Sequence, residues 1–171
     1  DLDRSLLLGY FVKNKLKVLT EQINDFWEEI MKLMISEILE NTSKLKTKEE
    51  QINYLRKNDN TPLRIIIQSA LHPQVKFLLP EGAPPFTPCP TGEAQGMLFS
   101  EARKMYLFVE GSNVNLNKTK RENLFITMLE SVDPKDAELL IAMKDKKLPY
   151  PIQYDVRSEE HTSELQSHWY I

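Results

Sequence analysis

The sequence predicts an all-α protein, an irregular bundle of about six short helices with one extended, proline-rich loop. Apolar residues recur three and four positions apart in several segments, which is the spacing of one helical face. Leucine, isoleucine and methionine are common while β-branched runs are scarce, a composition that favours helix over strand. Five prolines between residues 80 and 90 interrupt the helical pattern. The length of 171 residues fits one main domain, which we place at residues 31–156.

The first two predicted helices follow each other closely. A helix over residues 31–45 would turn one apolar face inward. That face comprises Met34, Ile35, Ile38 and Leu39. Thr47 and Glu50 match the Ser/Thr-x-x-Glu pattern of a capping box, so the second helix should begin there. Its Ile52 and Leu55 would face inward, and the polar sequence NDN would end it.

The third predicted helix begins beside a proline. Thr61 is the expected N-cap and Pro62 the first helical residue, where a missing N–H removes no helical hydrogen bond. The apolar face of this helix comprises Leu63, Ile66, Ile67 and Leu71.

An extended segment, which we call the strap, is predicted at residues 78–92. Its prolines exclude a helix or a central strand and favour a polyproline-like backbone. We expect Phe86, the only aromatic residue of the stretch PEGAPPFTPCP, to anchor the strap in the domain's own core. The alternative is that the strap docks into an aromatic groove of a partner protein. The candidate partner-binding residues are Pro84, Pro85, Phe86 and Pro88.

Three helices are predicted after the strap. The first covers residues 93–111, with Gly111 as its C-terminal stop. Its apolar stripe comprises Leu98, Ala102, Met105 and Val109. The second covers residues 117–132 and has a regular helical period. Its inward positions are Leu124, Phe125, Met128, Leu129 and Val132.

The last predicted helix begins with Asp133 as N-cap, followed by Pro134 at the first helical position. Asp136 would lie in the acidic first turn. Its expected inward residues are Ala137, Leu140 and Ile141. Lysines crowd its last turn, where they complement the helix dipole. The prolines at 149 and 151 end it.

Both ends of the chain depart from this pattern. Residues 157–168 read RSEEHTSELQSH and resemble the translated read-through of a sequencing adapter, so we expect residues 157–171 to be an adapter-derived tail and not a domain. Residues 1–30 have two interpretations. One is translated upstream sequence, because FWEEI requires purine-rich codons just before Met31, where a ribosome-binding site would lie. The other is an extra amphipathic helix. Its apolar face would comprise Leu16, Leu19, Ile23 and Phe26.

The sequence contains no pattern typical of an enzyme. Within residues 31–156, His72 and Cys89 are the sole histidine and cysteine, and a catalytic pair would need both in contact with an orienting group. No glycine-rich phosphate loop and no paired-histidine metal spacing is present. We therefore expect no catalysis, no cofactor and no metal. The apolar run from Leu6 to Val12 is shorter than the roughly 20 residues that cross a bilayer, so we expect no membrane association.

Basic residues form small clusters that are candidate contacts to nucleic acid. These residues are Arg103, Lys104, Lys118, Lys120, Arg121, Lys144, Lys146 and Lys147. Residues 31–156 contain 17 basic and 16 acidic side chains, a net charge of +1. Because nucleic-acid-binding domains have a clearer basic excess, we favour ordinary solvated lysines on helix surfaces.

Several segments together resemble one protein family. They are ISEILENTSKLKTKEEQINYLRKND, TPLR, FLLPEGAPPFTP, GMLFSEARK and KRENLFITMLESVDPKDAELLIAMKDKKLPYP. They are similar in order and spacing to a functionally uncharacterised family of small proteins encoded by large contractile-tailed phages of marine bacteria, of the cyanophage and pelagiphage type. The likeness spans residues 34–156. It implies a phage protein that acts in the host bacterial cytoplasm, and it carries over no catalytic or binding residues.

From these observations we expect a non-enzymatic phage accessory protein that binds a protein partner. The partner would belong to the replication, transcription or defence machinery of host or phage. The alternative is a nucleic-acid-associated protein that uses the basic clusters, and a steep fall of affinity with salt would identify it.

Overall fold

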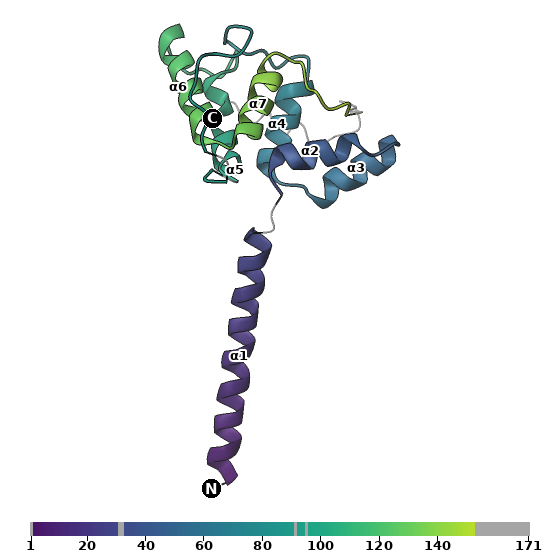
Figure 1. The fold of residues 1–171 in the computed structure, drawn as a ribbon, viewed down its shortest axis with the longest axis vertical. Helices are drawn as coiled ribbons and strands as arrows, with labels where there is room; N and C mark the ends of the chain where they lie inside the picture. Colours follow the sequence, from purple (N-terminus) through teal and green to yellow (C-terminus); the bar gives the residue numbers. More distant parts are fainter. Residues whose placement is uncertain (1, 31–32, 91, 95, 153–171) are drawn as a thin grey trace. The chain divides into compact units, whose positions relative to one another are not determined.

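The computed structural model describes residues 2–30, 33–90, 92–94 and 96–152, which Figure 1 draws as a ribbon. In these residues the chain forms seven α-helices, one 3-10 helix and no β-strand, which confirms the predicted all-α class. The elements are α1 (Leu2–Ile30), α2 (Ile35–Ser43), α3 (Lys48–Lys57), α4 (Thr61–Leu71), α5 (Leu98–Glu101), η1 (Ala102–Leu107), α6 (Lys118–Ser131) and α7 (Pro134–Lys144).

The chain divides into two compact units, with the division between Leu33 and Met34. The first unit contains α1, and the second contains all the other helices. The origin of residues 1–30 as translated upstream sequence stays a prediction. The predicted adapter-derived tail, residues 157–171, lies outside the described residues.

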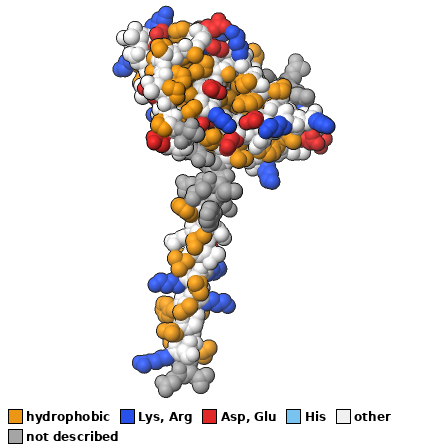
Figure 2. Space-filling model, in the orientation of Figure 1, with side chains coloured by type: hydrophobic (Ala, Val, Ile, Leu, Met, Phe, Trp, Pro, Cys, Tyr) orange, Lys and Arg blue, Asp and Glu red, His pale blue; other side chains and the backbone are white. Residues whose placement is uncertain are grey.

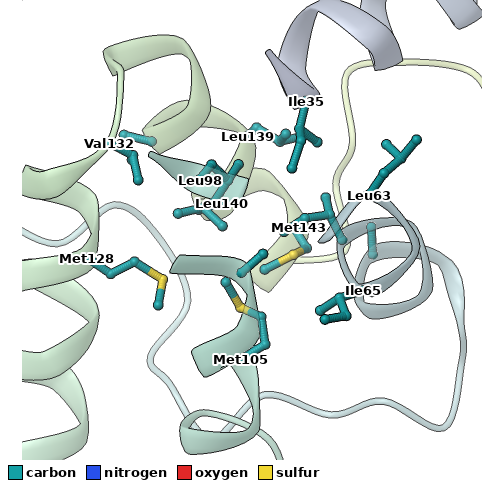
Figure 3. Close-up of a cluster of buried hydrophobic side chains, with 14 of the residues drawn as sticks. Ile35, Leu63, Ile65, Leu98, Met105, Met128, Val132, Leu139, Leu140 and Met143 are labelled. Carbon is teal, nitrogen blue, oxygen red and sulfur yellow. The ribbon is translucent and has the colours of Figure 1, made fainter. Parts of the chain in front are cut away.

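The core of the second unit lies where α4 and α7 pack together (Figure 3). Helix α7 also contacts α2 and α6, while α4 contacts α5 and η1, and α3 packs on α2. The rings of Phe108 and Phe125 meet edge to face with their centroids 5.4 Å apart. The buried side chains labelled in Figure 3 are Ile35, Leu63, Ile65, Leu98, Met105, Met128, Val132, Leu139, Leu140 and Met143.

Local capping residues start α3 and α7 as predicted. Thr47 Oγ1 accepts a hydrogen bond from the Glu50 N–H at 3.2 Å, and the Glu50 carboxylate accepts one from the Thr47 N–H at 3.1 Å. Asp133 is the N-cap of α7 and accepts a hydrogen bond from the Lys135 N–H at 3.0 Å. These bonds satisfy backbone donors that have no acceptor within the first helical turn.

Helix α4 begins one residue earlier than predicted. Asn60, not Thr61, is the N-cap, because its side-chain oxygen accepts a hydrogen bond from the Leu63 N–H at 2.8 Å. Thr61 is therefore the first helical residue and Pro62 the second. Asparagine is preferred over threonine as an N-cap, and a proline at the second position still lacks only an N–H that has no helical acceptor.

The helix predicted over residues 31–45 is shorter in the structure, where α2 runs from Ile35 to Ser43. Met34 has an extended backbone and precedes the helix as its N-cap. Its N–H donates to the Glu37 carboxylate at 2.9 Å, which stabilises this start. The predicted inward residues are confirmed, since Met34, Ile35, Ile38 and Leu39 are all buried.

The helix predicted over residues 93–111 is not a single regular helix. One turn of α5 passes into η1, and Val109 leaves the helical conformation to pair with Phe77 in an isolated antiparallel bridge. Gly111, with φ of +85°, turns the chain after this bridge and does not end a helix. The predicted stripe is still buried, although its members belong to α5, η1 and the bridge. Its members are Leu98, Ala102, Met105 and Val109.

Helix α1 carries many apolar side chains that remain exposed. Between residues 6 and 26 their exposed fractions run from 47% to 71%. Among the described residues, no helix is long and apolar enough to cross a membrane. The exposed apolar residues are Leu6, Leu7, Leu8, Tyr10, Phe11, Val12, Leu16, Val18, Leu19, Ile23 and Phe26.

Asp136 connects the first turns of α2 and α7. Its side chain is fully buried, and Oδ1 accepts a hydrogen bond from the Ser36 N–H at 3.2 Å. Within the described part of the chain, its second oxygen has no hydrogen-bond partner. Burial raises the pKa of Asp136 above its ordinary value of 3.8, and the contacts with Ser36 oppose this rise only in part.

Asp136→Asn is expected to change how stability depends on pH. Because the folded-state pKa lies above the ordinary value, the folded protein holds this proton more tightly, and stability falls as pH rises from 3.8 through the raised pKa. Asparagine cannot ionise, and its oxygen can still accept from the Ser36 N–H. Urea unfolding across this pH range should therefore show the variant gaining stability relative to wild type as pH rises. If the difference in unfolding free energy between variant and wild type does not change with pH, Asp136 has an ordinary pKa.

Candidate protein-interaction site

The strap crosses the second unit as extended chain, without helix or strand from residue 78 to residue 90. Its start is fixed by the bridge between Phe77 and Val109, beside which the Leu78 N–H donates to the Phe108 carbonyl at 2.7 Å. Farther along, Phe86 is half-buried and packs against the hydrophobic core. The geometry thus agrees with the expected internal anchor, while the contribution of Phe86 to stability stays a prediction.

The end of α7 clamps the first turn of the strap. The Lys144 side chain is only 2% exposed, and its amine donates to the carbonyls of Pro80 at 2.7 Å and Gly82 at 3.0 Å. The same amine pairs with the Asp145 carboxylate, whose other oxygen accepts from the Gly82 N–H at 3.0 Å. Gly82 has φ of +92°, a conformation that L residues rarely adopt. Two consecutive residues therefore hold one backbone turn of the strap: Lys144, the last residue of α7, and Asp145, its C-cap. We call these two residues the clamp.

A second contact holds the middle of the strap. The Thr87 N–H donates to the Glu130 carboxylate of α6 at 2.9 Å. Because this bond uses main chain on the strap side, it fixes the backbone without using a proline side chain. The segment between Gly82 and Thr87 is thus tied at both ends to different helices.

Between Pro85 and Cys89, half-buried residues of the strap lie three positions apart, and so do two exposed prolines. Phe86 and Cys89 are half-buried, while Pro85 and Pro88 are exposed. A polyproline-like segment has three residues per turn, so positions three apart share one side. The strap therefore divides into an inner edge, Phe86 and Cys89, and an outer ridge, Pro85 and Pro88. Pro84, the remaining candidate, is half-buried between them.

Three of the candidate cations bind the domain itself. Lys144 holds the strap, and Lys147 pairs with Glu81, also on the strap. The Glu81 carboxylate raises the pKa of Lys147 above its ordinary value. Lys146 donates to the carbonyls of Ser69 and His72 at the end of α4. These lysines therefore have structural partners that the sequence pattern did not predict.

Lys146 acts as a cation at the C-terminus of α4, where the helix dipole favours positive charge. Its ammonium group also lies 5.8 Å from the centroid of the Phe77 ring. Burial lowers the pKa of Lys146 to about 8. The backbone carbonyls of Ser69 and His72 favour the charged form, so the two influences oppose each other.

The other five candidate cations lie on η1 and α6. Lys104 pairs with Glu101 and Lys118 with Glu122, in each case one helical turn away. Arg121 donates to the carbonyls of Leu107 and Leu116 at 3.2 and 3.1 Å. The remaining two, Arg103 and Lys120, are exposed. On the face drawn in Figure 2, basic and acidic side chains are interspersed.

His72 and Cys89 have separate surroundings in the structure. His72 is buried at the end of α4, and its Nδ1 accepts a hydrogen bond from the Gln74 N–H at 3.2 Å. Cys89 is a half-buried free thiol on the inner edge of the strap. Across the described ranges, no group of three or more His, Cys, Asp or Glu side chains could hold a metal ion.

The fold and this surface define an all-α domain with an ordered proline-rich strap. Residues 38–150 match the model of a family of unknown function (DUF6433), and the chain belongs to that family. The matched region begins inside α2 and ends beyond α7, so it includes the whole strap. No curated protein and no solved structure matches the chain.

Proposed function

We propose that this chain is a phage accessory protein that acts in the host bacterial cytoplasm as a protein-interaction module, without catalytic activity. The phage origin rests on the family resemblance of the sequence. The partner would be a component of host or phage replication, transcription or defence machinery. The observation that carries the interaction role is the outer ridge of the strap, where Pro85 and Pro88 are exposed on a backbone fixed by Lys144, Asp145 and Glu130.

A fixed ridge of this kind suits recognition by an aromatic-lined groove. Such grooves bind proline side chains three residues apart on a polyproline-like backbone. Because the strap is already ordered by the clamp, binding would lose little conformational entropy. Phe86 is on the inner edge, so we assign it to anchoring and assign partner contact to Pro85 and Pro88.

Matched substitutions distinguish partner contact by Pro85 and Pro88 from anchoring by Phe86. Pro85→Ala with Pro88→Ala should abolish capture of a partner from infected-cell lysate and leave the free energy of unfolding within about 1 kcal/mol of wild type. Pro90→Ala removes an exposed proline that is not on the ridge, and it should leave capture unchanged. Loss of capture with Pro90→Ala alone would contradict the assignment of the ridge.

Phe86→Ala should have the opposite effect to the ridge variant: it should lower stability and leave capture of the partner unchanged. Because the ring is only partly buried, we expect a loss of about 1–3 kcal/mol in the free energy of unfolding, below the range for a fully buried phenylalanine. Chemical denaturation measures this loss directly. Unchanged stability together with lost capture would make Phe86 itself the contact residue.

The nucleic-acid alternative has less support, because most of the candidate cations have carboxylate or carbonyl partners within the domain. Binding to random DNA or RNA, measured over a range of salt concentrations, distinguishes the two functions. A steep decrease of affinity with salt would favour the alternative. Our proposal expects at most weak binding that is lost at physiological salt.

A further inference from the structure

The residue that follows the C-cap of α7 has a backbone conformation that favours glycine, yet it is a lysine. Lys146 has φ of +56°. Its N–H donates to the Met143 carbonyl at 3.1 Å, and the Lys147 N–H donates to the Ala142 carbonyl at 2.9 Å, a pair of bonds that commonly closes a helix C-terminus. Glycine is the usual residue at this position, but it supplies no side chain. The strain at Lys146 thus lies at a residue whose side chain makes specific contacts, which is typical of functional positions.

The Lys146 amine differs from the amines of the two nearest lysines, because Lys144 and Lys147 each pair with a carboxylate. Within the described ranges Lys146 has no acidic partner, and its amine donates to the backbone carbonyls of Ser69 and His72. A neutral amine keeps two N–H groups and gains one lone pair, so both bonds can persist when the third proton is lost. The lone pair is then directed away from the two carbonyls, and Lys146 is exposed to reagents in solution.

The position of the amine against the end of α4 also favours its neutral form. Partial burial there lowers the pKa of Lys146 to about 8. The titratable residues beside its contacts are His72, whose Nδ1 accepts a hydrogen bond and so carries no proton, and Lys76, which is exposed. At about pH 7.5 roughly a quarter of such amines are neutral, against about one in a thousand for a lysine with the ordinary pKa of 10.5.

We propose that the Lys146 amine is an acylation site, which takes an acyl group from a small activated donor, either an acyl phosphate or a thioester. The lone pair of the amine attacks the acyl carbonyl carbon and forms an amide N–C bond. The bond from that carbon to the phosphate oxygen or to the thiol sulfur breaks, the leaving group takes its electron pair, and the amine gives one proton to water. The amide has a single N–H, so it cannot donate to both carbonyls of α4. This inference is independent of the role proposed for the strap.

Acetylation kinetics of the full 171-residue chain, resolved for each lysine, test the proposal. The protein is incubated at about pH 7.5 with acetyl phosphate, or in a parallel arm with acetyl-coenzyme A. Peptides from a protease that does not cleave at lysine are then quantified by mass spectrometry. Lys146 should react roughly tenfold faster than its exposed neighbour Lys147, the matched control, because nucleophilicity falls with basicity and offsets part of the gain in neutral amine. Preference for Lys146 with either donor supports the site and identifies the donor class.

The pH profile separates an activated amine from an amine that is only accessible. The rate at Lys146 should rise with pH and level off above about pH 8, whereas the rate at Lys147, whose pKa is raised by Glu81, should continue to rise. The preference should disappear in urea, because the unfolded chain no longer holds the amine against α4. Equal rates at Lys146 and Lys147 at about pH 7.5, parallel pH profiles, or a preference that persists in urea would each overturn the proposal.

Discussion

Leu129→Ala is expected to lower the free energy of unfolding by about 2–5 kcal/mol, among the largest effects of any single substitution in this chain. Leu129 lies on the inner face of α6 and is fully buried in the core. Truncation removes apolar contacts and leaves a cavity that the neighbouring helices can fill only in part. Urea or thermal unfolding followed by circular dichroism measures the loss.

Leu78→Ala is the matched control for this prediction. The Leu78 side chain is 41% exposed, so the same truncation should cost well under half as much. Equal losses at the two positions would show that Leu129 is less buried than the structure indicates. A change below roughly 0.5 kcal/mol at Leu129 would mean that its face of α6 is exposed and available to a partner.

Lys144→Met is expected to destabilise the second unit by about 3–5 kcal/mol. Methionine preserves most of the aliphatic volume but removes the ammonium group. The carbonyls of Pro80 and Gly82 and the Asp145 carboxylate would then lose a shared donor in a site with little access to water. Breaking one partner of a buried pair is unfavourable because the other charge remains desolvated.

Lys147→Met provides the comparison, since Lys147 pairs with Glu81 on the same strap but both side chains are more than two-thirds exposed. Surface pairs of this kind contribute little to stability, because water and salt screen the two charges. Limited proteolysis adds a local readout, because loss of the clamp should expose the strap to cleavage near Gly82 while the helices persist. If Lys144→Met and Lys147→Met have the same small effect, the clamp does not stabilise the strap.

The sequence predicted the features that depend on residues close together along the chain. The capping box of Thr47 and Glu50 and the N-cap Asp133 act within one helical turn, so their pattern is readable without tertiary structure. The same holds for the strap, because proline restricts its own backbone wherever it occurs. The one-residue error at Asn60 arose because Thr61 is also an acceptable N-cap.

The sequence did not predict features that depend on distant partners. Lys144 and Lys146 had the pattern of ordinary lysines in a last helical turn, yet they bind backbone carbonyls more than 60 residues away. Asp136 matched an acidic first turn, but its hydrogen bond to Ser36 and its burial come from the packing of α2 on α7. In the same way, the bridge between Phe77 and Val109 ends the helical run after η1. No local pattern encodes these pairings.

The hydrogen bond between Ser36 and Asp136 also constrains when the domain can fold during synthesis. It joins residues that are 100 positions apart, as does the bond from the Gln51 side chain to the Pro151 carbonyl at 3.3 Å. Translation at about 5–20 residues per second separates the two partners of each bond by roughly 5–20 s. Throughout that interval α2 has been synthesised without α7, one of the helices that it packs against. The apolar face of Ile35, Ile38 and Leu39 therefore lacks its contacts with α7 until α7 is synthesised, and we expect the nascent chain to expose apolar surface for that interval.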